Sequence, residues 1–114
     1  MKKKHPQLQV LFGQKFDGVV EAVHYTKNGK IDWVRAYERR GPTWSDHVLL
    51  DRDMLVQRIE SGLRFFAGRR IQLEASEFEI GSRLELRAAP NGSLVVSAGI
   101  KDPKTDSLPE IPII

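Results

Sequence analysis

The residue types of a catalytic triad meet in the consecutive residues Ser45, Asp46 and His47. A serine nucleophile needs a histidine base and an acidic group held in one hydrogen-bonded line. Neighbouring side chains of an extended loop diverge, so three consecutive residues do not form that line. We therefore interpret Ser45 and Asp46 as turn-forming residues, and we expect the protein not to be an enzyme.

Acidic residues and a histidine near residue 50 have side chains of the kind that bind hard metal ions: Asp46, His47, Asp51 and Asp53. Asp51 and Asp53 already suit the start of a helix, and no calcium-loop spacing accompanies them. A second acidic group, at residues 74–79, is explained by the solvated face of a strand. The chain has no cysteine, which excludes zinc sites built on thiolates. We therefore expect no metal and no cofactor.

Phosphate-binding loops rich in glycine are absent from the sequence, because its nine glycines never cluster. The closest approach is Gly68, Arg69 and Arg70, where two cations lie beside a flexible turn. Two adjacent arginines alone make a weak anion site. The sequence therefore offers no nucleotide-binding motif of this type.

One segment alternates aromatic rings with cations. If this segment is a strand, its side chains alternate between two faces, and Ile31, Trp33, Arg35, Tyr37 and Arg39 share one of them. On an exposed face, the rings would stack on bases while the guanidinium groups meet phosphates. Each stacked base contributes about 1–3 kcal/mol. The predicted nucleic-acid-binding residues are Lys30, Trp33, Arg35, Tyr37, Arg39, Arg40 and Trp44.

The opposite orientation of the same strand remains an alternative. Trp33 and Tyr37 would then belong to the core, with the arginine stems along its edge. Tryptophan and tyrosine are more often buried than displayed. In the first orientation, Val34 and Ala36 supply a small aliphatic core behind the exposed face. The function therefore depends on which face of the strand meets water.

A β-hairpin must position these side chains, because two β-rich runs flank the Asn-Gly dipeptide at residues 28–29. Asn-Gly between two such runs is the strongest short-range hairpin signal. A two-residue turn, which we favour, pairs His24 with Trp33. A three-residue turn with a bulge instead pairs Glu21 with Arg35, which electrostatic attraction favours.

One helix is predicted to follow, with Asp51 as its N-cap, Asp53 in its first turn and Gly62 beyond its end. A helix of about 10 residues is unstable alone and must lie on a sheet. The expected later strands cover residues 63–67, 70–74, 78–80, 83–89 and 93–98. The predicted fold class is α+β: an N-terminal β-hairpin, one short α-helix, then a meander of short antiparallel strands, forming a bent sheet or a partly open barrel.

Both ends of the chain differ from its middle. Residues 1–14 are predicted to be a basic, extended arm, residues 15–100 a single domain, and residues 101–114 a proline-rich tail. The tail either docks on a partner, folds back over its own domain or frays. The predicted partner-binding residues are Leu8, Val10, Phe12, Ile111, Ile113 and Ile114.

Composition limits the class of protein. The chain has 114 residues, of which 40% are hydrophobic and 29% charged, enough for one folded domain. Residues 1–40 carry nine basic and four acidic side chains, whereas the rest carry nine and eleven. A basic surplus of this kind favours a polyanion or an acidic partner. The sequence has no signal-peptide core and no apolar run of about 18 residues, so we expect a cytoplasmic protein that does not bind membranes.

Two functions are compatible with these patterns. The first is a small non-catalytic protein that binds single-stranded DNA or RNA with low sequence specificity through the basic and aromatic hairpin face. The alternative is a protein-interaction adaptor or a subunit of a larger complex, including a homodimer, that uses the N-terminal strand and the isoleucine-rich tail.

Overall fold

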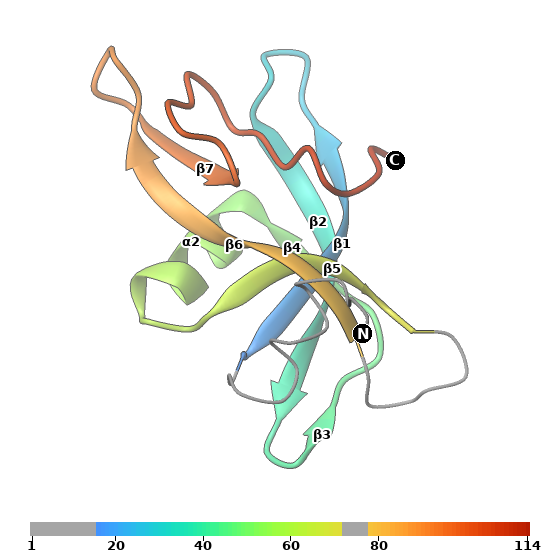
Figure 1. Ribbon diagram of the computed structural model, residues 1–114. Helices are drawn as coiled ribbons and strands as arrows, with labels where there is room; N and C mark the ends of the chain where they lie inside the picture. Colours follow the sequence, from blue (N-terminus) through green and yellow to red (C-terminus); the bar gives the residue numbers. More distant parts are fainter. Residues whose placement is uncertain (1–15, 72–77) are drawn as a thin grey trace, which may run out of the picture.

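The computed structural model describes residues 16–71 and 78–114, in which four strands precede the one helix and three strands follow it. The sheet follows the order β3-β2-β1-β5-β6-β7, and β4 also pairs with β2. It is open and strongly curled into a half-barrel (Figure 1). The elements are β1 (Gly18–Tyr25), β2 (Ile31–Arg40), β3 (Thr43–Trp44), β4 (Val48–Asp51), α2 (Arg52–Glu60), β5 (Phe65–Arg70), β6 (Phe78–Ala88) and β7 (Leu94–Ala98).

The α+β class and the bent, open sheet are confirmed. Strands β5, β6 and β7 pair antiparallel in succession, as the predicted meander requires. However, β5 joins β1 in parallel, with Gly18 opposite Phe65, so the sheet is not purely antiparallel. A parallel neighbour needs a crossover, and the chain supplies one through β4 and α2. Residues 78–80 and 83–89 were predicted as two strands, but a single strand, β6, runs from Phe78 to Ala88, and Ala89 lies just beyond its end.

The first hairpin closes through a three-residue loop, so the favoured two-residue turn is wrong. Thr26 N donates to Lys30 O over 2.7 Å, Gly29 N donates to Thr26 O over 3.0 Å, and Gly29 has a φ of 84°. His24 nevertheless lies opposite Trp33, because Asp32 adds a residue to β2. Glu21 is a second extra residue, this time in β1. From Val20 toward the start of β1, the strands therefore pair in the register that the three-residue loop requires.

The irregularity at Asp32 also changes which side chains share a face. Ile31 is 2% exposed and lies in the main core with Val34 and Ala36. A regular strand would place Ile31 on the face of Trp33, opposite Val34. The prediction that Ile31 belongs to the basic and aromatic face is therefore wrong. An extra residue moves the side chains on its two sides onto different faces.

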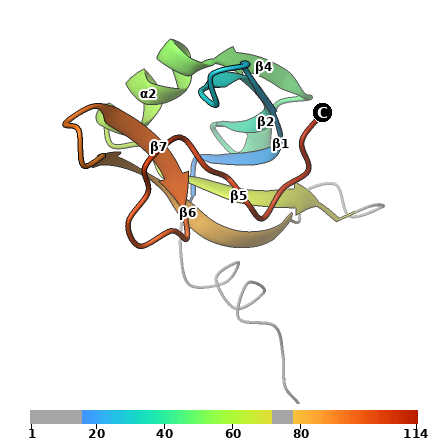
Figure 2. The same cartoon turned by 90° about the horizontal axis from the view of Figure 1, so that it is seen from above.

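The helix begins and ends as its sequence predicts. The Asp51 carboxylate accepts a 2.8 Å hydrogen bond from Met54 N, and Gly62 adopts a φ of 94° just beyond the helix. Leu55 is its one fully buried residue and packs in the main core. In Figure 2, α2 and β4 lie at the top of the view, and β5 and β6 lie below them. No helix within residues 16–71 and 78–114 is long and apolar enough to cross a membrane.

Residues 101–114 fold back over the domain, which was one of the three alternatives for the tail. Ser107 pairs with both Val96 and Ala98 of β7, and Val23 of β1 pairs with the backbone of residues 112–114. Leu108 and Ile111 are buried in the main core. Figure 1 shows this segment crossing from β7 to β1. The end of the chain therefore closes one side of the half-barrel.

Substitution of Gly68 by alanine should destabilise the fold by about 1–3 kcal/mol, the usual range for overpacking. A Cβ at this position would overlap the Glu79 carbonyl oxygen on the neighbouring strand β6. Urea denaturation measures the change. Arg69→Ala is the control, because Arg69 is exposed on the same strand and its ion pair with Glu79 should contribute less than about 1 kcal/mol. An equal loss for both variants would contradict the crowding argument.

Candidate nucleic-acid interface

The sheet carries apolar clusters on both of its faces. Val20 of β1 lies in the main core, whereas its neighbour Val19 lies in a second cluster. Consecutive residues of a strand point to opposite faces, so the second cluster is on the face away from α2. Its buried members are Phe16, Val19, Tyr37, Phe66, Phe78 and Ile80, and Trp44 packs against them.

Two arginines cover the aromatic rings of this second cluster. The guanidinium carbon of Arg39 lies 4.7 Å from the ring centroid of Trp44, and that of Arg70 lies 4.7 Å from the ring of Tyr37. The ring of Phe78 lies 4.7 Å from Trp44 and 5.3 Å from Tyr37, so it joins the two stacks. Arg39 Nε also donates to the Phe16 carbonyl oxygen over 2.9 Å. The two guanidinium groups are thereby held in fixed positions.

These two arginines and Arg40 differ from most arginines of the protein. Within the described ranges, no carboxylate lies at ion-pairing distance from Arg39, Arg40 or Arg70. Their charge is therefore not neutralised by an acidic side chain of the described part of the protein. The arginines that do form ion pairs are Arg35, Arg52, Arg58, Arg64, Arg69 and Arg87.

A hydrogen-bonded network lies beside Tyr37 on the same face. His47 Nε2 lies 2.6 Å from Glu21 Oε2 and 2.7 Å from the Tyr37 hydroxyl oxygen. Arg35 Nε donates to the same Glu21 oxygen over 2.8 Å. Glu21 is the extra residue of β1, and a bulge of this kind re-aims a side chain. The network neutralises Arg35 and fixes the phenol of Tyr37.

Burial raises the pKa of Tyr37 above its usual value, and the nearby carboxylate of Glu21 raises it further. We expect Glu21→Gln to lower this pKa, because the substitution removes the negative charge that opposes the phenolate. Absorbance titration of the phenol in a Tyr25→Phe background measures it, since Tyr37 is then the one remaining tyrosine. Glu85→Gln is the control, because Glu85 lies on β6 and does not contact Tyr37. A pKa that is unchanged by Glu21→Gln would contradict this account.

The predicted aromatic residues are less exposed than the nucleic-acid hypothesis requires. Tyr37 is 5% exposed, so the expectation that its ring meets water is wrong: Arg70, His47 and Phe78 pack against it. Trp33 is half-buried and stacks on His24, with ring centroids 5.2 Å apart and planes inclined by 11°. Trp33 therefore keeps a partly accessible ring, whereas Tyr37 anchors the cluster.

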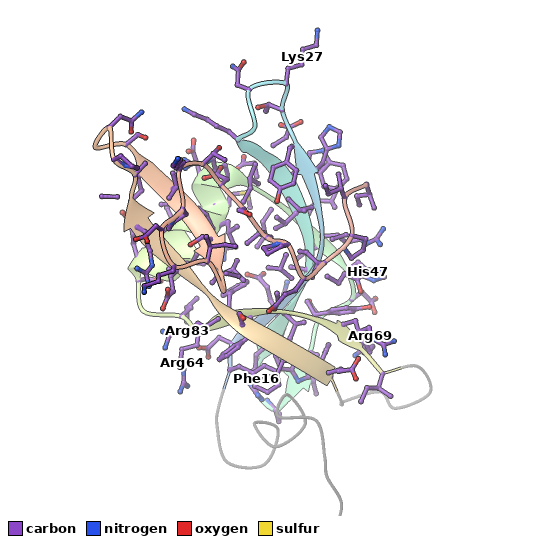
Figure 3. The ribbon with its side chains drawn as sticks, turned by 45° about the horizontal axis from the view of Figure 1, so that its top comes forward. Phe16, Lys27, His47, Arg64, Arg69 and Arg83 are labelled. Atoms are coloured by element: carbon purple, nitrogen blue, oxygen red, sulfur yellow. The ribbon has the colours of Figure 1, made fainter. Side chains whose placement is uncertain are left out.

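The predicted cations divide between the two ends of β2. Arg39 and Arg40 end the strand beside Trp44, and both are exposed. Lys30 is exposed at the hairpin loop, before the strand begins. In Figure 3, Lys27 of that loop lies at the end of the molecule opposite Phe16. The structure therefore separates Lys30 from the arginines over the aromatic cluster.

The predicted partner-binding residues have different surroundings. Ile111 is 7% exposed and belongs to the main core, so its side chain does not reach a partner. Ile113 and Ile114 are 70% and 44% exposed. Leu8, Val10 and Phe12 lie outside the described residues.

The loop that resembles a triad in sequence does not bring its members together. The Ser45 hydroxyl donates to Asp46 O over 2.7 Å and accepts from Glu38 N over 2.9 Å. His47 instead contacts Tyr37 and Glu21. Within residues 16–71 and 78–114, no group of three or more His, Asp or Glu side chains is arranged to hold a metal ion.

Sequence patterns did not predict several of the residues that form this face. Phe16 and Phe78 carry no local signal, because each lies in a separate part of the chain and they meet only through the fold, with ring centroids 6.2 Å apart. Glu21 and His47 likewise meet across β1 and the loop before β4. Arg70 did carry a signal, since it ends the Gly68-Arg69-Arg70 segment, but its position over Tyr37 depends on β5.

The face combines rigid aromatic rings with guanidinium groups whose N–H donors suit an anion of delocalised charge. In Figure 3, Phe16 of this face lies in the lower part of the molecule, and His47 and Arg69 lie at its right. Comparisons with protein-family models, curated proteins and solved structures found no match to this chain. The function therefore has to be inferred from the side chains themselves.

Proposed function

We propose that the protein binds single-stranded nucleic acid with low sequence specificity through the arginine–aromatic face. We define this face as Phe16, Tyr37, Arg39, Trp44, Arg70 and Phe78. One observation supports the proposal above the others: two guanidinium groups lie over aromatic rings and have no carboxylate partner within the described part of the chain.

Contact with an aromatic ring orients the guanidinium group of an arginine before a phosphate binds. The guanidinium group contacts the ring through its flat face, so N–H donors remain at its edge. A planar fork of donors matches two oxygens of one phosphate. Because the ring already restricts the side chain of Arg39 or Arg70, less rotamer freedom is lost when a phosphate binds. Arg40, exposed beside Arg39, adds a third cation.

Trp33 gives the same face a site for base stacking. Trp33 and Arg39 are six residues apart on β2, which corresponds to a distance of about 20 Å along a strand. A single strand that lies along β2 would meet phosphate-binding groups at one end and a partly exposed indole at the other. Stacking and phosphate contacts accept any base, so the expected sequence specificity is low.

The test is fluorescence anisotropy with a labelled single-stranded oligonucleotide over a series of salt concentrations. We expect saturable binding at low salt that weakens as salt rises. With three phosphate contacts, from Arg39, Arg40 and Arg70, the slope of log K against log salt is expected to be about −2. Absence of saturable binding at low salt would overturn the proposal, and so would an affinity that does not depend on salt.

The alternative function, a protein-interaction subunit that uses the tail, has less support. Ile111 is buried, and the last residue of the tail is tied to β1: Ile114 N donates to Val23 O over 2.8 Å, and the Ile114 carbonyl oxygen lies 2.7 Å from His24 Nδ1. Much of the tail is thus used to complete the domain. Ile113 and Ile114 remain as its exposed large hydrophobic side chains.

A further inference from the structure

Strand β6 is longer than its neighbours and leaves part of one edge open. Residues 84–88 pair with β7 on one side. On the other side, the pairing with β5 ends at Arg83, opposite Phe66. No strand of the described chain pairs with residues 84–88 on that side. An open strand edge is a template for pairing with another chain.

The hydrogen bonds of the β6–β7 hairpin show which backbone groups face this edge. Ala89 N donates to Ser93 O over 2.8 Å, so these two residues form a hydrogen-bonded pair. Hydrogen-bonded and non-hydrogen-bonded pairs alternate along an antiparallel ladder. Ala88–Leu94 and Leu86–Val96 are therefore non-hydrogen-bonded pairs. The N–H and C=O groups of Ala88 and Leu86 point away from β7, toward the open edge.

Strand β7 confirms this assignment from its other side. Ala98 N donates to Ser107 O over 3.1 Å, and Val96 O accepts from Ser107 N over 2.9 Å. Val96 and Ala98 therefore direct their backbone groups away from β6, as members of non-hydrogen-bonded pairs do. Ser107 of the C-terminal segment therefore covers the outer edge of β7, whereas no strand of the described residues pairs with the free edge of β6.

A groove of about 820 Å³ lies along this part of β6. Ile59 of α2 lines it together with Leu84 and Leu86, whose side chains point to the core face. Glu85 and Arg87 alternate with them and are exposed on the opposite face, where they pair with each other: Arg87 Nη2 lies 3.0 Å from Glu85 Oε1. A strand placed at this edge would find hydrogen-bonding groups, an apolar wall and a pair of charges.

The sequence of β6 is self-complementary about Leu86. If a second copy pairs antiparallel with Leu86 opposite Leu86, each Glu85 faces the Arg87 of the other copy. Leu86 then faces Leu86, so an apolar residue opposes an apolar residue. Opposite charges across a strand pair stabilise it, whereas a shift of the register by one residue opposes charged and apolar side chains. Charge complementarity therefore selects one partner and one register.

We propose that two copies of this chain form a symmetric dimer by pairing the open edges of β6 antiparallel about Leu86. The two Leu86 residues exchange N–H···O=C hydrogen bonds, and Glu85 of each copy lies opposite Arg87 of the other. A two-fold pairing of this kind is isologous and closes on itself. Dimer formation does not depend on nucleic-acid binding. In the dimer, the arginine–aromatic faces of both copies lie on the same side of a continuous sheet.

Analytical ultracentrifugation of the full chain tests the dimer. Variants that reverse the charge of Glu85 or Arg87 are compared with the wild type. We expect wild-type protein to dimerise, and Glu85→Arg to weaken the dimer at least about tenfold, because arginine then faces arginine. Arg87→Glu should have the same effect. The double variant Glu85→Arg/Arg87→Glu restores opposite charges and should dimerise like the wild type. Arg69→Glu is the control, since it reverses an exposed charge paired with Glu79 elsewhere.

Cysteine cross-linking tests the register. The chain has no cysteine, so any disulfide that forms must join the introduced thiols. A mixture of Glu85→Cys and Arg87→Cys proteins should form a disulfide-linked dimer on mild oxidation, and either protein alone should form much less.

A wild-type chain that remains monomeric at about 100 μM would overturn the proposal. A dimer that Glu85→Arg and Arg87→Glu leave unchanged would also overturn it, because it would use another surface. Circular dichroism of each variant establishes that it is folded. Both charges are exposed, so the single reversals are not expected to unfold the domain.

Discussion

Replacement of Asp106 by alanine should lower the free energy of unfolding by about 3–5 kcal/mol, the range for loss of one partner of a buried ion pair. Asp106 is 4% exposed, and its carboxylate accepts hydrogen bonds from Ile31 N at 2.7 Å and Val96 N at 2.9 Å. Arg52 Nε donates to it over 2.8 Å. One side chain of the C-terminal segment thus joins β2, β7 and α2, and its removal leaves three donors without an acceptor.

Urea denaturation and thermal melting measure this effect. For a domain of this size, the midpoint should fall by more than about 10 °C. Asp102→Ala is the matched control, because Asp102 lies in the same segment but is exposed, and it should change stability by less than about 0.5 kcal/mol. A loss below about 1 kcal/mol for Asp106→Ala would contradict the linking role of this carboxylate.

The same carboxylate makes stability depend on pH. Burial pushes the pKa of Asp106 upward, but hydrogen bonds from Arg52, Ile31 and Val96 outweigh it, so the folded-state pKa is lowered. A lowered pKa means that the stabilisation is fully present above the unfolded value of about 3.9 and is lost as pH falls through the folded value. We expect the free energy of unfolding to fall below pH 4 in the wild type, and to fall less in Asp106→Ala.

The second large effect concerns nucleic-acid binding. We expect the double variant Arg39→Ala/Arg70→Ala to lose about 100-fold in affinity for single-stranded DNA at low salt, since a hydrogen bond to a charged group contributes about 1.5 kcal/mol or more. These residues hold the two guanidinium groups over Trp44 and Tyr37. Fluorescence anisotropy measures the loss.

Lys27→Ala/Lys104→Ala is the matched control for net charge. It also removes two positive charges, but Lys27 lies in the β1–β2 loop and Lys104 precedes Thr105, whose hydroxyl donates to Gly29 O of that loop. Both lysines are therefore at the end of the protein opposite the arginine–aromatic face, as Figure 3 shows for Lys27. An equal loss of affinity in both double variants would mean that net charge, and not the arginine–aromatic face, determines binding.

Local patterns predicted the local structure well. Asp51 and Gly62 marked the ends of α2, and the strands predicted at residues 83–89 and 93–98 correspond to the second half of β6 and to β7. Two features were missed. The parallel pairing of β1 with β5 joins residues far apart in sequence. The irregularity at Asp32 moved Ile31 to the other face of β2, which strict alternation does not anticipate.

The candidate site was predicted only in part, for a related reason. The period of two brought Arg35, Tyr37 and Arg39 onto one face, but whether that face meets water depends on what packs over it. Arg70 and Phe78 come from β5 and β6 and cover Tyr37, so a ring predicted to bind bases instead supports an arginine. Strand periodicity specifies a face, whereas exposure is a property of the whole fold.

The central claim is that nucleic acid contacts the end of the sheet where Arg39 and Arg70 lie. Chemical-shift mapping of backbone amides during titration with a single-stranded oligonucleotide tests it most directly. We predict that the largest shifts fall at Trp33, at residues 37–44, around Arg70 and at Phe78, while residues 26–30 and 104–107 stay unchanged. Shifts confined to residues 26–30 and 104–107, or no shifts at all at low salt, would contradict the claim.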